Sequence, residues 1–202
     1  MLEKLGSLRI TTLFAAGLFV GLVTNFRVSE EFLWLTLLCL IFAVGVSMGL
    51  EINKLVTMSR EKIYLGLKLI LATTVGSLIG GIITHSLLRE PALKYSLIIS
   101  AGMGWYSFTG TYLTSIDPYL GFLGYLSNVL REVYTYVTYP LLAKKLKYSS
   151  ISLGGATTMD TTLPIIASIG GVEVGVLAFI HGAFLTLLIP VIVPLLNSLP
   201  LG

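Results

Sequence analysis

Residues 95–116, YSLIISAGMGWYSFTGTYLTSI, contain no aspartate, glutamate, lysine or arginine, yet Gly102, Gly104 and Gly110 interrupt them. The run is long enough for a helix that crosses the hydrocarbon core of a bilayer, which takes about 17–25 residues. Each glycine disfavours a helix by about 1 kcal/mol relative to alanine, so the cluster predicts a break. Because lipid offers no partner to the freed amides and carbonyls, the break has to line a cavity that protein encloses.

The remainder of the chain is similarly apolar. Of its 202 residues, 55% are hydrophobic and 11% are charged, whereas soluble domains carry about 25% charged residues. Further uncharged runs occur at residues 10–26, 32–50, 69–88 and 174–202. They are continuously apolar rather than alternating, which favours helices over the strands of a β-barrel. We therefore expect an all-α polytopic membrane protein in which residues 1–202 form a single membrane transport domain.

A second broken segment is predicted at Ile151–Ile169. It contains GGATTMDTTLP, which starts with two glycines and ends at Pro164, and proline disfavours a helix interior by about 3 kcal/mol. The first apolar segment is expected to be a retained span rather than a cleaved signal peptide. The full set of predicted segments is Leu8–Thr24, Phe32–Leu50, Ile63–Leu88, Leu93–Ser115, Leu120–Leu142, Ile151–Ile169 and Val172–Leu199.

The distribution of lysine and arginine predicts the topology. If segments 93–115 and 151–169 both enter the membrane and return to the same side, one side holds nine positive residues and the other three. If segment 93–115 crosses fully, the balance becomes six to six. Because positive residues gather on the cytoplasmic side, we expect about five transmembrane helices plus two re-entrant segments, with a cytoplasmic N-terminus and an outside C-terminus.

The order of the segments also permits an inverted repeat. Span Ile63–Leu88 precedes the first broken segment, and span Leu120–Leu142, which runs in the opposite direction, precedes the second. Inverted repeats that place broken helices at the centre of the membrane are typical of secondary transporters. The sequence therefore indicates a secondary transporter of a polar solute.

Three polar residues stand in the middle of Leu120–Leu142: Asn128, Arg131 and Glu132. A charged side chain at this depth costs at least about 2.5 kcal/mol, so it needs a partner or a water-filled cavity. Asn128 and Glu132 share a helix face, whereas Arg131 points about 100° away from Glu132. The group is either a structural interhelical ion pair or part of a solute site, and the second interpretation is favoured. The face continues through Thr135, Tyr136 and Tyr139.

Asp160 also has two interpretations. It can cap the half-helix that starts near Pro164, or it can present a carboxylate to a cationic solute or to a coupling proton. The amides at the half-helix N-termini, near Gly104 in the first broken segment, would attract an anionic group such as an amino acid carboxylate. Further hydrogen bonds to the solute are expected from Tyr106, Ser107 and Thr158.

Other functions have little support in the sequence. Cys39 is the single cysteine and no Cys/His pattern suggests a metal site, so we expect neither a metal nor a cofactor. The net charge of +3 is spread over short loops and does not indicate nucleic-acid binding. The only aspartates are Asp117 and Asp160, so an intramembrane hydrolase, and an enzyme in general, is disfavoured. His181 is expected to hydrogen bond between helices rather than to carry protons.

Six fragments resemble the prokaryotic lysine exporter family LysO; in chain order they are IFAVGVSMGL, SLIGG, SAGMGWYSFTG, NVLREV, GGATTMDTTLP and HGAFLTLLIP. The GWYS, LRE and GGAT-x-MD-x-TLP elements together are the specific ones. The resemblance implies export of L-lysine, and of lysine analogues, across the prokaryotic inner membrane by antiport with protons. It identifies Glu132 and Asp160 as the carboxylates that bind lysine and couple it to protons.

Longer members of that family begin with an extra group of apolar spans and a further intramembrane acidic residue, which this chain lacks. The resemblance therefore implies a homodimer or a complex with a small multi-span membrane protein. The alternative is a passive channel, or a subunit of a two-component transporter for another cationic or polar amino acid, because broken helices suit channels too.

Overall fold

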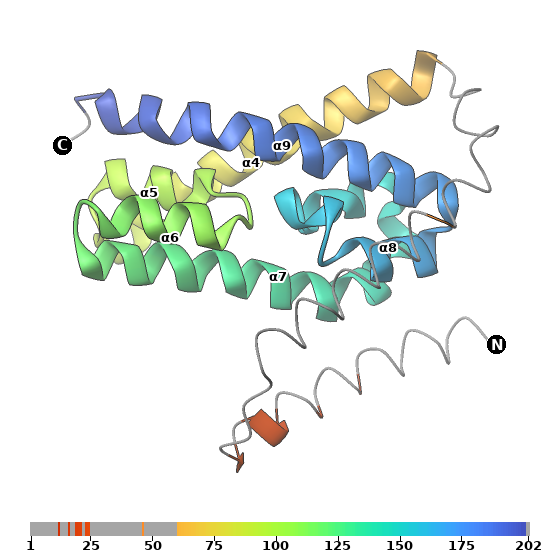
Figure 1. Cartoon of the computed structure of the whole chain (residues 1–202). Helices are drawn as coiled ribbons and strands as arrows, with labels where there is room; N and C mark the ends of the chain where they lie inside the picture. Colours follow the sequence, from red (N-terminus) through yellow and green to blue (C-terminus); the bar gives the residue numbers. More distant parts are fainter. Residues whose placement is uncertain are drawn as a thin grey trace.

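The computed structural model describes residues 60–200, together with residues 12, 16, 19–21, 23, 24 and 46. The predicted spans Leu8–Thr24 and Phe32–Leu50 lie outside the described residues, apart from those isolated positions. Within the described part the chain is helical and contains no strand, as predicted (Figure 1). The elements, with 3-10 helices labelled η, are α4 (Arg60–Leu88), α5 (Leu93–Ala101), α6 (Tyr106–Thr114), α7 (Pro118–Leu146), η1 (Lys147–Leu153), η2 (Gly155–Met159), α8 (Leu163–Gly170) and α9 (Val172–Ser198).

The three long helices α4, α7 and α9 extend along the molecule (Figure 1). Tyr64–Leu88 in α4 and Val172–Ser198 in α9 are long and apolar enough to cross a membrane. Helix α7 is 29 residues long and carries Arg131 and Glu132 near its middle. It therefore combines the length of a span with charges that a lipid-facing helix would not tolerate.

Helix α7 starts slightly earlier than predicted because Asp117 caps it. The carboxylate Oδ1 of Asp117 accepts hydrogen bonds from the amides of Tyr119 at 2.8 Å and Leu120 at 3.1 Å, and Pro118 occupies the first helical position. This aspartate satisfies amides that have no partner inside the helix. It thus has a local structural role at the end of a hairpin.

The first broken segment forms a helical hairpin. Helix α5 runs from one end of the molecule to its centre, the chain turns over residues 102–105, and α6 returns to the same end (Figure 1). Gly104 has a φ of 99°, a conformation that favours glycine, and the amide of Trp105 donates to the carbonyl of Gly102 at 2.7 Å. The break predicted from the glycines is confirmed.

The second broken segment enters from the opposite end. The 3-10 helices η1 and η2 lead to the centre, and α8 returns to the end from which the segment came (Figure 1). The hydroxyls of Thr157 and Thr158 donate to the carbonyls three residues earlier, Gly154 at 2.9 Å and Gly155 at 2.8 Å. These bonds reinforce the tight 3-10 pitch, in which residues i and i+3 are neighbours.

The turns of the two hairpins touch at the centre of the molecule. The amide of Ala156 donates to the carbonyl of Met103 at 2.8 Å, and a Cβ on Gly104 would lie 3.0 Å from the carbonyl oxygen of Gly154. Each hairpin packs into its own apolar cluster. The first cluster includes Ile98, Leu113, Leu185 and Ile189, and the second includes Tyr139, Ile151, Leu163 and Ile166.

The directions of α4 and α7 agree with the antiparallel order of an inverted repeat. Helix α4 runs towards the end where the first hairpin opens, and α7 runs back towards the end where the second opens (Figure 1). The two possible repeat units differ in the element that leads into each broken segment, since α5 is an α-helix and η1 is a 3-10 helix. An internal repeat therefore stays a prediction.

We expect Gly155→Ala to destabilise the protein. A Cβ there would collide with the carbonyl of Met103, which joins the two turns, and alanine disfavours the φ of 61° at this position. The thermal unfolding midpoint of the purified protein in detergent should fall by several degrees. The matched control is Gly76→Ala, whose Cβ meets no neighbouring atom of the described residues within 4 Å and which should leave the midpoint unchanged or raise it. Equal midpoints for the two variants would contradict the contact between the turns.

Candidate functional site

Asn128 holds the first turn against α7. Its Oδ1 accepts a hydrogen bond from the amide of Gly104 at 2.7 Å, and its Nδ2 donates to the carbonyls of Ile99 at 3.1 Å and Gly124 at 2.9 Å. The side chain is buried, and these bonds engage both of its polar atoms. The structure gives Asn128 a positioning function, and its direct contact with a solute stays a prediction.

Arg131 joins α7 to the second broken segment and to α4. Its Nε donates to the carbonyl of Leu153 at 3.0 Å, its Nη2 to the carbonyl of Ser152 at 2.9 Å, and its Nη1 to the hydroxyl of Ser77 at 2.8 Å. Within the described part of the chain, no carboxylate lies within ion-pair distance of the guanidinium. The interhelical ion pair considered from the sequence is therefore absent from these residues.

Glu132 belongs to a group of side chains on another face of α7, which we name the carboxylate cluster: Glu132, Asp160, Tyr106, Tyr136 and Thr161. Glu132 lies near the side chain of Thr161 and within electrostatic range of Asp160. Tyr106 and Tyr136 lie within electrostatic range of both carboxylates. The hydroxyl of Tyr136 donates to the carbonyl of Thr161. All five residues are partly buried, so the structure brings the two predicted carboxylates together in a sheltered place.

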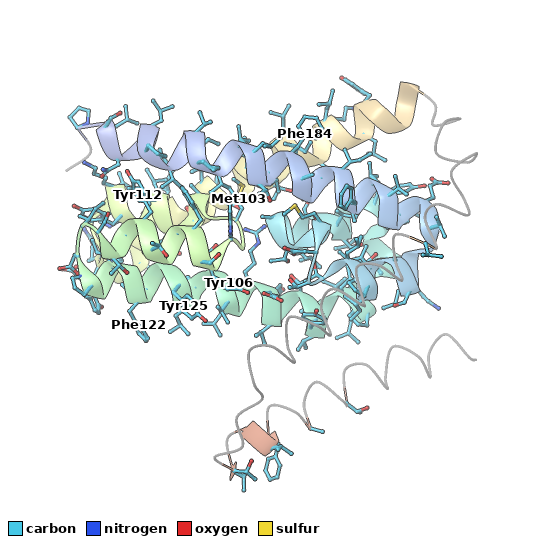
Figure 2. The ribbon with its side chains drawn as sticks, viewed as in Figure 1. Met103, Tyr106, Tyr112, Phe122, Tyr125 and Phe184 are labelled. Atoms are coloured by element: carbon cyan, nitrogen blue, oxygen red, sulfur yellow. The ribbon has the colours of Figure 1, made fainter. Side chains whose placement is uncertain are left out.

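Tyr106 reaches the cluster from the start of α6, immediately after the first turn. Its ring packs edge-to-face against Tyr125 of α7, with ring centroids 5.5 Å apart (Figure 2). This contact fixes the tyrosine beside α7. The carboxylate cluster is thus assembled from three elements: α6, α7 and the turn between η2 and α8.

Asp160 does not cap α8, so that interpretation is wrong. The cap position is Thr162, and the amide of Leu163, which an aspartate cap would satisfy, bonds instead to the backbone carbonyl of Asp160 at 3.2 Å. The carboxylate Oδ1 accepts from the amide of Thr161 at 2.6 Å and lies 3.4 Å from its hydroxyl. Because the backbone supplies the cap, the carboxylate remains directed towards the cluster.

Thr158 belongs to a buried network between helices. Its hydroxyl shares its hydrogen between the carbonyls of Gly155 and Ala178, each 2.8 Å away, and lies 3.1 Å from Nδ1 of His181. The other ring nitrogen of His181, Nε2, lies 2.9 Å from the hydroxyl of Thr73. The network joins η2, α9 and α4, which agrees with the interhelical function expected of His181.

The amides of residues 104–106, which lead into α6, already have partners. The amide of Gly104 donates to Asn128, that of Trp105 to the carbonyl of Gly102, and that of Tyr106 to the carbonyl of Gly104 at 3.0 Å. The anion site predicted on these amides is therefore occupied by groups of the protein itself. Ser107 follows on the exposed side of the first turn of α6. Contact of Gly104, Ser107 and Thr158 with a solute stays a prediction.

A cavity of about 1010 Å³ lies on the Arg131 side of α7. Helices α4, α5, α7 and η1 form its walls, and its lining includes Ser77, Ser127, Asn128 and Arg131. The carboxylate cluster does not line it. Arg131 and Glu132, although consecutive in the chain, therefore belong to two separate polar regions.

Three residues of these regions were not among the predicted site residues. Tyr136 stands four residues after Glu132; it was predicted to share that helix face but was not assigned to the site. Thr161 directly follows Asp160. No sequence pattern pointed to Ser77, because its hydrogen bond to Arg131 depends on how α4 lies relative to α7. Among the described residues there is no group of three or more side chains of the kind that hold a metal ion.

Comparison with known proteins identifies relatives along most of the chain. A family model described as "Lysine exporter LysO" matches residues 11–197. The chain is 30% identical over 200 residues to the "Lysine exporter LysO" of Escherichia coli (strain K12), and the match covers 96% of this chain and 65% of that protein. It is 32% identical over 169 residues to a Haemophilus influenzae protein named "Putative lysine exporter", covering 82% and 84% of the two chains. No solved structure matches.

We expect Asn128→Ala to lower the free energy of unfolding by roughly 1–3 kcal/mol, because the buried amide of Gly104 loses its partner. Denaturant unfolding in detergent, followed by tryptophan fluorescence, measures this loss. The neighbouring Ser127→Ala removes an exposed hydroxyl and should change stability little. If the two variants lose the same stability, Asn128 does not hold the first turn.

Proposed function

The chain belongs to the lysine exporter LysO family, and from this membership we propose that it exports L-lysine from the cytoplasm in exchange for protons. The family consists of transporters, in agreement with the prediction that the protein is not an enzyme. The chain spans 65% of the length of its Escherichia coli relative, so the activity of that whole protein is carried over to this chain as a proposal.

The observation that carries the proposal is the juxtaposition of Glu132 and Asp160 in one partly buried cluster. Two carboxylates close together repel each other when both are charged and unpaired. A bound ammonium group or a bound proton relieves this repulsion. Lysine and protons would therefore compete for the same oxygens. Such a site exchanges one for the other if it faces the two sides of the membrane in turn and reorients only when it is occupied.

The arrangement of the hairpins supports a transporter rather than an open channel. They enter from opposite ends, and their turns meet through the bond between Ala156 and Met103 (Figure 1). In a membrane this arrangement makes both hairpins re-entrant, with α4, α7 and α9 as full crossings. On the predicted topology, the N-terminus lies in the cytoplasm and the C-terminus outside, so each hairpin opens to a different side.

A partner is part of the proposal as well. The match to the Escherichia coli relative leaves about a third of that protein uncovered. We propose that this chain forms the path together with a second copy of itself or with a small multi-span membrane protein. The mass of the complex purified from its native membrane distinguishes a homodimer from an assembly with a different subunit.

Proton coupling predicts the response of lysine flux to a pH gradient. In proteoliposomes held at zero membrane potential, an acidic interior should accelerate uptake of external radiolabelled lysine several-fold, and a protonophore should abolish the acceleration. Vesicles without protein are the control. Lysine flux that ignores the pH gradient would indicate a channel, and a complete absence of flux, with or without a co-purified subunit, would contradict lysine transport.

Glu132→Gln should abolish lysine resistance in a strain that lacks its own exporter, while the protein still reaches the membrane. The variant keeps the shape of the side chain but removes the charge that binds an ammonium group or a proton. Glu173→Gln is the matched control, because Glu173 lies at the exposed start of α9, where it accepts a hydrogen bond from Tyr148 at 2.6 Å. Full resistance in the Glu132 variant would remove this residue from the mechanism.

A further inference from the structure

The cavity between α4 and α7 has polar groups set in a mainly apolar lining. Its lining includes the hydroxyls of Ser77, Thr84, Ser96, Ser100, Ser127 and Ser149, together with the amide of Asn128. Thr84, Ser96 and Ser100 donate to backbone carbonyls. The hydroxyls of Ser127 and Ser149 have no such partner among the described residues, and in lipid they would lose their hydrogen bonds to water without replacement. A volume of about 1010 Å³ is ample for water and for a small solute. The cavity is therefore expected to be water-filled.

Its charges are few and unevenly placed. Among the lining residues of the described chain, Arg131 is the single lysine or arginine and Glu90 the single carboxylate. Glu90 lies in the connection between α4 and α5, where the first hairpin opens, whereas Arg131 lies near the middle of α7. The inner part of the cavity thus carries a positive charge without a negative one.

Arg131 keeps donors available for a ligand. A guanidinium has five N–H groups, and in this structure each of its nitrogens makes one bond, to Leu153, Ser152 or Ser77. Each terminal nitrogen retains a second N–H. Those bonds end on neutral oxygens, so the positive charge of the side chain remains uncompensated within the described residues. A carboxylate is the ligand that a guanidinium binds best, through two parallel hydrogen bonds.

A carboxylate-bearing solute has no comparable site among the other groups described above. The amides of residues 104–106 bond to protein groups, and the carboxylate cluster would repel an anion. We propose that the cavity is a second subsite on the transport path, in which Arg131 binds the α-carboxylate of the exported amino acid. The choice of lysine rests on the proposed function, but the attraction of anions into the cavity does not.

The test introduces a single cysteine into the cavity of the full-length protein in proteoliposomes. Ser127→Cys, in a Cys39→Ser background, places a thiol on the cavity wall, and Val137→Cys, exposed on α7 outside the cavity, is the matched control. Both variants are treated with a small thiol reagent that carries a sulfonate and with its trimethylammonium counterpart. The modification rate of the protein cysteine by each reagent is divided by the rate at which the same reagent modifies a free thiol in solution. We expect Ser127→Cys to prefer the sulfonate on the order of tenfold, and Val137→Cys to react with neither.

Further variants assign the preference to Arg131. Arg131→Gln should abolish it, and Arg131→Lys, which keeps the charge, should retain most of it. Gly80→Leu should slow both reagents by filling the cavity, since a Cβ at Gly80 meets no atom within 4 Å. Lysine should protect Ser127→Cys from the sulfonate at concentrations at which 1,5-diaminopentane, the same molecule without its carboxylate, does not.

The outcomes separate the two proposals. An unreactive Ser127→Cys, equal normalised rates, or a preference that survives Arg131→Gln would overturn the anion subsite, whether or not the protein exports lysine. Equal protection by lysine and the diamine would overturn the carboxylate assignment and leave lysine export in place. An Arg131-dependent sulfonate preference without lysine protection or lysine flux would support the anion-binding cavity and contradict lysine as the solute.

Discussion

The described structure depends on a backbone constraint. Two segments leave helical geometry at the centre of the protein, and the amides and carbonyls freed there need partners that lipid cannot provide. The segments satisfy one another through Ala156 and Met103, and α7 satisfies several further groups through the side chains of Asn128 and Arg131. Everything else of functional interest, including the place of Asp160, follows from where these bonds hold the two turns.

Helix α7 is the element around which the polar regions are organised. Its buried stripe of Asn128, Thr135 and Tyr139 faces the hairpins. Arg131 lies on one side of this stripe and lines the cavity, and Glu132 lies on the other side within the carboxylate cluster. One helix therefore separates a region suited to anions from a region suited to cations. Any amino acid presents one group of each kind, a carboxylate and an ammonium.

Much of the helical fold could be predicted from the sequence, because its signals are local. Charge-free runs indicated α4 and α9, and the glycines around Gly104 and Gly155 indicated the breaks. Glu132 and Asp160 were found because charges in apolar segments are rare. Of the two interpretations of Asp160, the helix cap is wrong, since the amide of Leu163 bonds to the backbone carbonyl of Asp160 rather than to its side chain. The cavity could not be predicted, because it depends on how α4 packs relative to α7.

The adjacency of Arg131 and Glu132 has a mechanical consequence. Both side chains are fixed to one continuous helix, so they cannot be reoriented independently by a rigid-body rotation of α7. A turn of that helix about its own axis that brings Glu132 closer to the hairpins carries Arg131 away from them, and the reverse turn does the opposite. Any such rotation would therefore change access to the carboxylate cluster, which suits cations, and to Arg131, which suits anions, at the same time. Access to one would increase as access to the other decreased.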